Sequence, residues 1–201
     1  MVTVVEDSLP LSKGARTRQA LLEGAIRRFA NDGYRGASVS DVARDAGLTP
    51  AAVYAYFDGK EDLFAAAVDA DAAGLIHAAL DPILTGTFDG EWTFLITALV
   101  EGLEDHPLAR RLLSGREPEH TVRMLEIPAL AQLRQAIAER LRAGQDTGEV
   151  RADIDPVLAA SGLEATIMAI LIAALQTGVP ADGDRAAGVV ALLEAALRPP
   201  R

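Results

Sequence analysis

The sequence contains no cysteine and few aromatic residues, which make up 4% of the chain. The absence of cysteine excludes disulfides, thiolate catalysis and thiolate zinc sites, and it is compatible with a reducing cytoplasm. The longest apolar run, from Ala165 to Leu175, has 11 residues, whereas a membrane span needs about 20. The first 16 residues carry Glu6 and Asp7 and no apolar core, unlike a signal peptide. We therefore expect a cytoplasmic protein that does not associate with membranes.

Basic residues are also scarce, and the formal net charge is -10. The acidity is uneven, because residues 1–65 hold 8 basic and 9 acidic residues, whereas residues 66–201 hold 11 and 20. This balance excludes diffuse binding to polyanions, but it permits a local DNA contact made by the near-neutral N-terminal part. Lys13, Arg16 and Arg18 are clustered there.

Helical periodicity dominates the sequence, and no convincing alternating strand is present, so we predict an all-α fold. The first helix covers residues 16–32, with Leu22, Ile26 and Phe29 on one face and Gly33 as its stop. Two short helices follow, and Ser38 and Thr49 are predicted to be their N-caps. The pattern predicts further helices over residues 60–81, 90–104, 107–114, 119–144, 156–177 and 183–198.

The two short helices have the spacing of a helix-turn-helix. Ala43 is a small residue where the second helix must pack closely, and Gly47 can adopt a positive φ in the turn. Val53 then returns an apolar side chain to the core. These offsets are typical of DNA-binding modules, although an ordinary αα-corner would satisfy them as well.

The surrounding stretch "FANDGYRGASVSDVARDAGLTPAAVYAYFDGKEDLF" resembles the N-terminal domain of the tetracycline-repressor-like (TetR) family of transcription regulators. The resemblance extends from Thr17 to about Leu63. It implies an N-terminal three-helix helix-turn-helix domain, joined through a long helix to a C-terminal helical domain for ligand binding and dimerisation. We accordingly expect domains at residues 1–62 and 63–201.

The resemblance also implies a DNA-binding surface that grips phosphates around an uncharged recognition helix. Ser38 and Thr49 would offer helix N-termini to phosphates, and apolar groups would contact base edges such as thymine methyls. Family members commonly carry Gly-Thr in place of Ala51-Ala52, so specificity would shift toward DNA shape, Arg44 or the basic arm. The predicted DNA-binding residues are Arg18, Ser38, Arg44, Thr49, Pro50, Ala51, Ala52, Tyr54 and Lys60.

The C-terminal region suggests a dimer interface and a pocket, with ordinary core packing as the alternative for each residue. Its helix over residues 156–177 is apolar around nearly its whole circumference, so it must be covered on every side. We predict a four-helix interface between two subunits that includes Ile167, Leu171, Leu175, Val189, Leu193 and Leu197. We predict a mostly apolar ligand pocket that includes Trp92, Leu99, Leu103, His106, His120, Met124 and Met168.

Enzymatic motifs are missing. The segment from Glu117 to His120 has the E-x-x-H spacing of carboxylate-bridged di-iron sites, but such sites need two copies and two further glutamates. No H-E-x-x-H, G-x-S-x-G or phosphate-binding glycine loop is present. We therefore predict a regulator without catalytic activity, metal or cofactor: a homodimeric repressor released from operator DNA by a small hydrophobic or amphipathic ligand. The alternative is a helical small-molecule carrier or dimeric scaffold without DNA binding.

Overall fold

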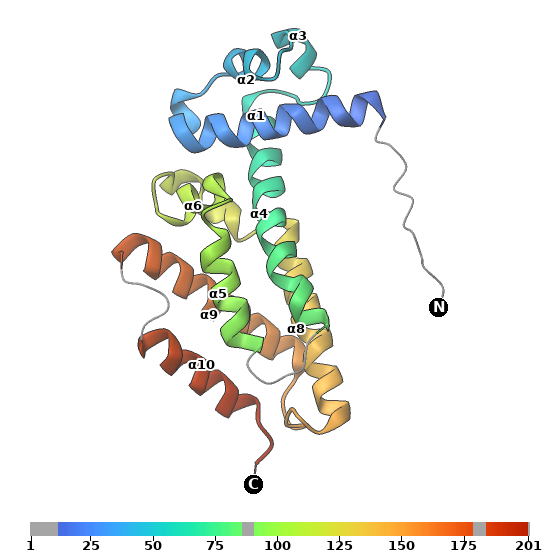
Figure 1. The fold of residues 1–201 in the computed structure, drawn as a ribbon, viewed down its shortest axis with the longest axis vertical. Helices are drawn as coiled ribbons and strands as arrows, with labels where there is room; N and C mark the ends of the chain where they lie inside the picture. The colour runs from blue at the N-terminus through green and yellow to red at the C-terminus, as the bar shows by residue number, and fades with distance from the viewer. Residues whose placement is uncertain (1–11, 86–90, 179–183, 201) are drawn as a thin grey trace. The chain divides into compact units, whose positions relative to one another are not determined.

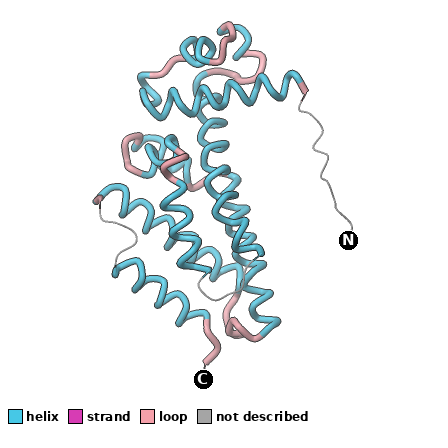
Figure 2. Tube along the Cα trace, in the orientation of Figure 1, coloured by secondary structure: helices cyan, strands magenta, loops and turns pink. Residues whose placement is uncertain are grey.

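The computed structural model describes residues 12–85, 91–178 and 184–200, and within these ranges the chain is helical with no strand (Figures 1 and 2). It forms two compact units, Met1–Ala67 and Val68–Arg201. The all-α prediction is confirmed. The predicted domain boundary, after residue 62, and the boundary between the units both lie inside helix α4, Lys60–Thr85.

Unit 1 consists of α1 (Lys13–Gly36), α2 (Val39–Asp45), α3 (Pro50–Val53) and the beginning of α4. Figure 1 shows α2 and α3 lying on one side of α1. The hydroxyl oxygens of the predicted N-caps accept backbone hydrogen bonds, Ser38 from the Asp41 amide and Thr49 from the Ala52 amide. Gly33 has φ 75° and interrupts α1, which resumes for a last turn to Gly36.

Unit 1 is organised around an aromatic cluster. The rings of Phe29 and Phe64 meet edge to face with their centroids 4.9 Å apart, and Tyr34 meets Phe64 at the same distance. Phe29 and Phe64 are almost fully buried, so α1 and the start of α4 share one core. Such pairs add about 0.5–1.5 kcal/mol beyond the burial of their area. They hold the scaffold on which α2 and α3 are mounted.

Unit 2 contains the remainder of α4 and a set of helices that form a separate core. They are α5 (Glu91–Gly102), α6 (Pro107–Leu113), the 3-10 helix η1 (Pro118–His120), α7 (Thr121–Met124), α8 (Pro128–Thr147), α9 (Pro156–Thr177) and α10 (Asp184–Leu197). α8 and α9 make the most extensive helix pair of this unit. Gly148 and Gly178 end them in the left-handed conformation that glycine adopts without strain.

The structure differs from the predicted bounds of several helices: α1 begins three residues earlier and ends four residues later than predicted, for example. The single helix expected over residues 119–144 is divided into η1, α7 and α8. Ile127 has extended backbone angles and Pro128 begins α8, because a proline disfavours the helical conformation of the residue before it. The helix predicted to end at residue 81 continues to Thr85.

Two helices, within Lys60–Leu80 and Pro156–Thr177, are long and apolar enough to cross a membrane by length and composition alone. These helices pass the test although the longest apolar run has 11 residues, because the mean hydropathy also counts alanines that polar residues separate from such a run. Core helices of soluble proteins have the same composition, and 56% of the α4 window is buried in the protein. In α9 only 28% is buried, so much of an apolar helix faces outward.

Candidate nucleic-acid interface and effector pocket

The turn between α2 and α3 has the geometry that a helix-turn-helix requires. Gly47 has φ 69°, and its neighbour Leu48 donates its backbone N–H to the Ala43 carbonyl at 2.8 Å. Ala43 and Val53 are completely buried, as the close approach of the two helices demands. The small residue, the glycine and the aliphatic residue therefore have the structural roles predicted from their spacing.

The surface of α3 is exposed and carries no charge. Thr49, Pro50 and Ala51 are exposed, Ala52 is half-buried, and Tyr54, immediately after the helix, is 60% exposed. The Thr49 oxygen accepts the Ala52 amide at 3.3 Å, so this cap holds the first turn in place. The face presents methyl groups, a proline ring and one phenol, which suits apolar contacts with bases and a hydrogen bond to phosphate.

Two of the three basic residues predicted to bind DNA lie over aromatic rings. The Arg18 guanidinium lies 5.2 Å from the Phe57 ring centroid, and the Lys60 ammonium lies 4.7 Å from that of Tyr34. Lys60 Nζ also donates to the Arg35 carbonyl at 3.4 Å. These contacts restrict two flexible cations at little energetic gain, since exposed cation–π pairs contribute about 0.5–1 kcal/mol.

The third basic residue, Arg44, belongs to a small network at the start of α2. Its guanidinium, 69% exposed, pairs with Asp41 at 2.5 Å. The Ser38 hydroxyl donates to the other oxygen of Asp41 at 2.6 Å, and this bond, followed by that from Arg44, lowers the pKa of Asp41. The Ser38 hydroxyl proton is therefore engaged within the protein, which leaves the backbone amides of this helix N-terminus as the groups that a phosphate could contact.

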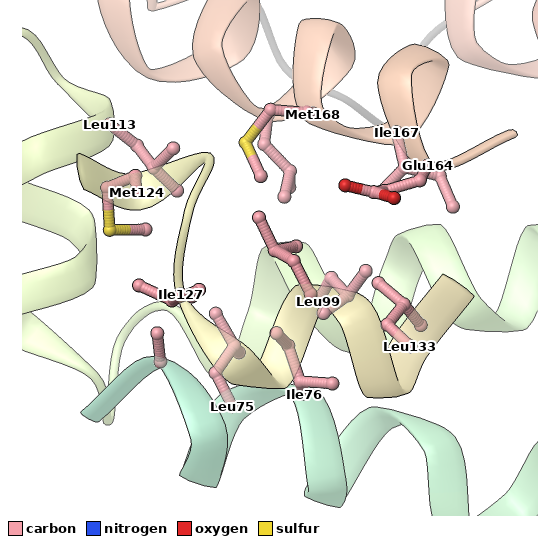
Figure 3. Close-up of a pocket in the computed structure, with 13 residues that line it drawn as sticks. Leu75, Ile76, Leu99, Leu113, Met124, Ile127, Leu133, Glu164, Ile167 and Met168 are labelled. Atoms are coloured by element: carbon pink, nitrogen blue, oxygen red, sulfur yellow. The ribbon is translucent and has the colours of Figure 1, made fainter. Parts of the chain in front are cut away.

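A pocket lies within unit 2 between α4, α5 and the helices from α6 to α9. The space inside it that atoms do not fill amounts to about 400 Å³, which includes open solvent. Figure 3 shows the Glu164 carboxylate pointing from α9 into this space toward Leu99. The described lining residues are Ala72, Leu75, Ile76, Leu99, Leu113, Met124, Ile127, Leu130, Leu133, Glu164, Ile167, Met168 and Leu171.

Three of the predicted pocket residues line this space: Leu99, Met124 and Met168. Leu103 is buried, but it is not among the described lining residues, and neither is His120. The side chain of Trp92 lies outside the described residues. Sequence reasoning missed Glu164, although it lies three residues before the buried Ile167 and thus on the same side of α9.

His106 has a structural role beside a buried carboxylate that sequence reasoning also missed. Its Nδ1 lies 3.1 Å from Asp71 Oδ1, while Asp71 Oδ2 accepts the amides of Leu108 and Ala109 at 2.9 and 2.8 Å. Asp71, on α4, thus caps the N-terminus of α6 from another helix, which favours a negative charge there. Its position among Val68, Ala72 and Leu75 is the sequence signal of a buried face.

The apolar surface of α9 differs from the predicted interface. Ile167 and Leu171 are 3% exposed and Leu197 is 5% exposed, so these side chains face the interior of the subunit; Leu175, Val189 and Leu193 are half-buried. Ile167 and Leu171 are buried because the side of α9 that carries them packs against the pocket and the core of the same subunit. The outer face of α9 is defined by the exposed residues Leu158, Gly162, Ala165, Ala169 and Ala173, and Ala191, Leu192 and Ala195 are exposed on α10.

Comparison with known proteins shows the family. The family described as "Bacterial regulatory proteins, tetR family" matches residues 21–67. The chain is 30% identical over 193 residues to the HTH-type transcriptional repressor AcnR of Corynebacterium efficiens, covering 94% of this chain and 96% of that protein. AcnR of Corynebacterium diphtheriae is likewise 30% identical over 193 residues, with 90% and 91% covered.

A similar fold is found in a solved TetR-family transcriptional regulator from Cytophaga hutchinsonii. It has a TM-score of 0.71 at 20% sequence identity and covers 94% of this chain and 98% of that one. Members of this family are regulatory proteins, so the prediction that the chain is not an enzyme is confirmed. The chain belongs to the TetR family and is a ligand-responsive, DNA-binding transcriptional regulator.

Proposed function

We propose that this regulator is a cytoplasmic repressor, which binds operator DNA as a homodimer and is released when a hydrophobic or amphipathic ligand occupies the pocket of unit 2. The observation that carries the proposal is the pocket itself, whose described lining is apolar except for one carboxylate. The names of the AcnR relatives support repression. The alternative of a carrier or scaffold lacks DNA binding, which the exposed, capped α3 argues against.

In this proposal DNA affinity comes from phosphate contacts around α3 and from apolar contacts made by α3. Tyr54 would donate its phenolic hydrogen to a phosphate, and Arg44 and Lys60 would supply positive charge. Arg44 is itself exposed and would exchange its half-buried partner Asp41 for a phosphate, since ion pairs near the surface are weak. Arg18 would contribute positive charge to DNA binding as part of the basic N-terminal arm. Thr49, Pro50, Ala51 and Ala52 would contact the groove, and Ser38 would contribute backbone amides.

The homodimer would use the outer face of α9 together with the exposed residues of α10. The small residues Gly162, Ala165, Ala169 and Ala173 recur every three or four positions, so they share one face and let a second helix approach closely. An apolar helix of which so little is buried in one subunit needs a cover. A two-fold dimer would also present two copies of α3 to paired half-sites.

A mobility-shift titration with the DNA upstream of the protein's own gene tests the central claim. A specific shift, abolished by Pro50→Gly combined with Tyr54→Ala but retained by Glu101→Ala in unit 2, is expected. A well-folded protein that shifts neither this DNA nor any fragment of a genomic library would favour the carrier. Loss of the shift on addition of an apolar ligand would support release.

The dimer has its own test, because Ala169 is exposed and its replacement leaves the core of the subunit intact. Ala169→Glu should give monomers by sedimentation at micromolar concentration, since it would place two carboxylates in an apolar interface. Ala131→Glu, an equally exposed alanine on α8, is the matched control and should remain dimeric. Dimers of Ala169→Glu as stable as the wild type would exclude this face.

A further inference from the structure

Glu164 is the one ionisable side chain among the described residues that line the pocket. Only 14% of its side chain is exposed, so its carboxylate has left most of the bulk water. A carboxylate in an apolar lining is unfavourable unless it is paired with a cation or accepts hydrogen bonds. This single polar group must therefore dominate the choice of ligand head group.

An arginine that does not line the pocket pairs with the Glu164 carboxylate. Arg134, on α8, donates its Nε hydrogen to Glu164 Oε2 at 2.5 Å. Its side chain is 40% exposed and is not among the described lining residues. Within the described parts of the chain, this is the one protein hydrogen bond made by the Glu164 carboxylate, and Oε1 makes none. An acceptor thus remains available to a ligand at the pocket.

We propose that the effector of this regulator is a lipophilic amine, with an apolar body among the leucine, isoleucine and methionine side chains and a protonated nitrogen on Glu164. The inference rests on the proposed effector role of the pocket and specifies its ligand class. An ammonium donates the hydrogen bond that Oε1 lacks and adds a charge that is screened less inside the pocket than at the exposed Arg134.

The other head groups fit less well. A carboxylate or phosphate would meet the Glu164 charge inside the pocket, while the only described cation beside it lies behind that residue and toward solvent. A neutral alcohol can donate to Oε1, but without the charge that roughly doubles the strength of such a bond. The acidic surroundings, 20 acidic against 11 basic residues in residues 66–201, also raise the local concentration of cations.

The test compares three probes that share one apolar chain: n-octylamine, 1-octanol and octanoate. The chain has three methionines, and two of them, Met124 and Met168, line the pocket. Carbon-13 labelled methionine methyl groups therefore report occupancy of this site directly by NMR, separately from amphiphile binding to the acidic surface. Octylamine remains protonated at pH 7, because alkyl amines titrate near pH 10.

The full-length protein and two variants of equal charge change are titrated. Octylamine should bind about tenfold more tightly than octanol, and octanoate should bind most weakly, consistent with the stronger bond to a charged donor. Glu164→Gln should remove this advantage and leave octanol within about threefold. Glu139→Gln, an exposed carboxylate on α8, should behave as the wild type.

The opposing outcomes separate the claims. If octanol matches octylamine, if octanoate binds best, or if Glu164→Gln leaves the preference unchanged while the methionine signals shift, the amine assignment is wrong and the apolar pocket stands. If none of the probes moves Met124 or Met168, both the amine assignment and the proposed pocket fail. Operator release is assayed separately, so binding without release would refute only the repressor mechanism.

Discussion

Replacing Asp71 with alanine should destabilise the protein, because two backbone amides depend on its carboxylate. The amides of Leu108 and Ala109 donate to Asp71 Oδ2, and both residues are completely buried. In the folded protein these amides are therefore shielded from bulk water. An unsatisfied buried donor costs about 1–3 kcal/mol, and partial relaxation of α6 limits the loss from the pair to about 3 kcal/mol.

The assay is thermal unfolding of wild type, Asp71→Ala and Asp71→Asn. A change of 1 kcal/mol shifts the Tm of a chain of this length by about 2–4 °C, so the alanine variant should melt about 6–12 °C below wild type. Asparagine retains one acceptor oxygen and loses the charge that the N-terminus of α6 favours, so its loss should be about half as large. Exposed Glu101→Ala on α5 should change stability by less than about 0.5 kcal/mol.

The ranking of the three proteins by Tm distinguishes the loss of the acceptor from the loss of the charge. An alanine variant that melts within about 2 °C of wild type would show that the two amides find other acceptors, and that the cap is unimportant. An asparagine variant as unstable as the alanine variant would instead assign the whole effect to charge.

Three further outcomes follow from other residues. Lys60→Ala should weaken binding to operator and random DNA by similar factors and reduce the salt dependence by about one unit; an unchanged slope in mobility-shift titrations would confine its ammonium to the Tyr34 contact. Gly47→Val should destabilise by about 1–2 kcal/mol in urea unfolding, because φ 69° is unfavourable for a side chain even though no atom obstructs it; Gly47→Asn should lose less, and equal losses would contradict the strain argument. Burial raises the pKa of Asp69 and the nearby Arg123 partly opposes this, so the folded state takes up a proton more readily than the unfolded one. Wild type should therefore gain stability relative to Asp69→Asn as the pH falls from 7 to about 4, and parallel pH profiles would refute the shift.

The DNA-binding unit was largely predictable from the sequence, because its structure is determined by local rules. Ser38 and Thr49 cap the helices that follow them, α2 and α3, and Gly47 has the positive φ that the turn between these helices requires. Phe29 and Val53 are buried as their helical spacing indicates. The caps and the turn act on neighbours within a few positions, and the burial of Phe29 and Val53 follows from their helical spacing, so one sequence suffices to place these residues.

The ligand-binding unit was predicted less well, because its features depend on contacts between distant segments. Asp71 caps a helix that begins more than 30 residues later, and Glu164 pairs with Arg134 on another helix. Helical periodicity marks α9 as apolar on all sides, but it does not say which side faces the subunit. For this reason Ile167 and Leu171 were assigned to the dimer interface, whereas they lie in the interior.

The bare surface of α3 has a consequence for how this regulator can evolve. Ala51 and Ala55 are exposed, and the first turn of the helix is held by Thr49 and Pro50 rather than by those alanines. Arginine, glutamine and lysine are nearly as favourable in helices as alanine, so they can replace Ala51 within α3 at little cost in stability. In the proposed DNA complex, such a replacement at Ala51 would add a long polar side chain beside the bases while the phosphate contacts stay in place. New operator preferences are therefore open to this protein at little cost in stability, although each of these replacements needs at least two nucleotide changes in an alanine codon.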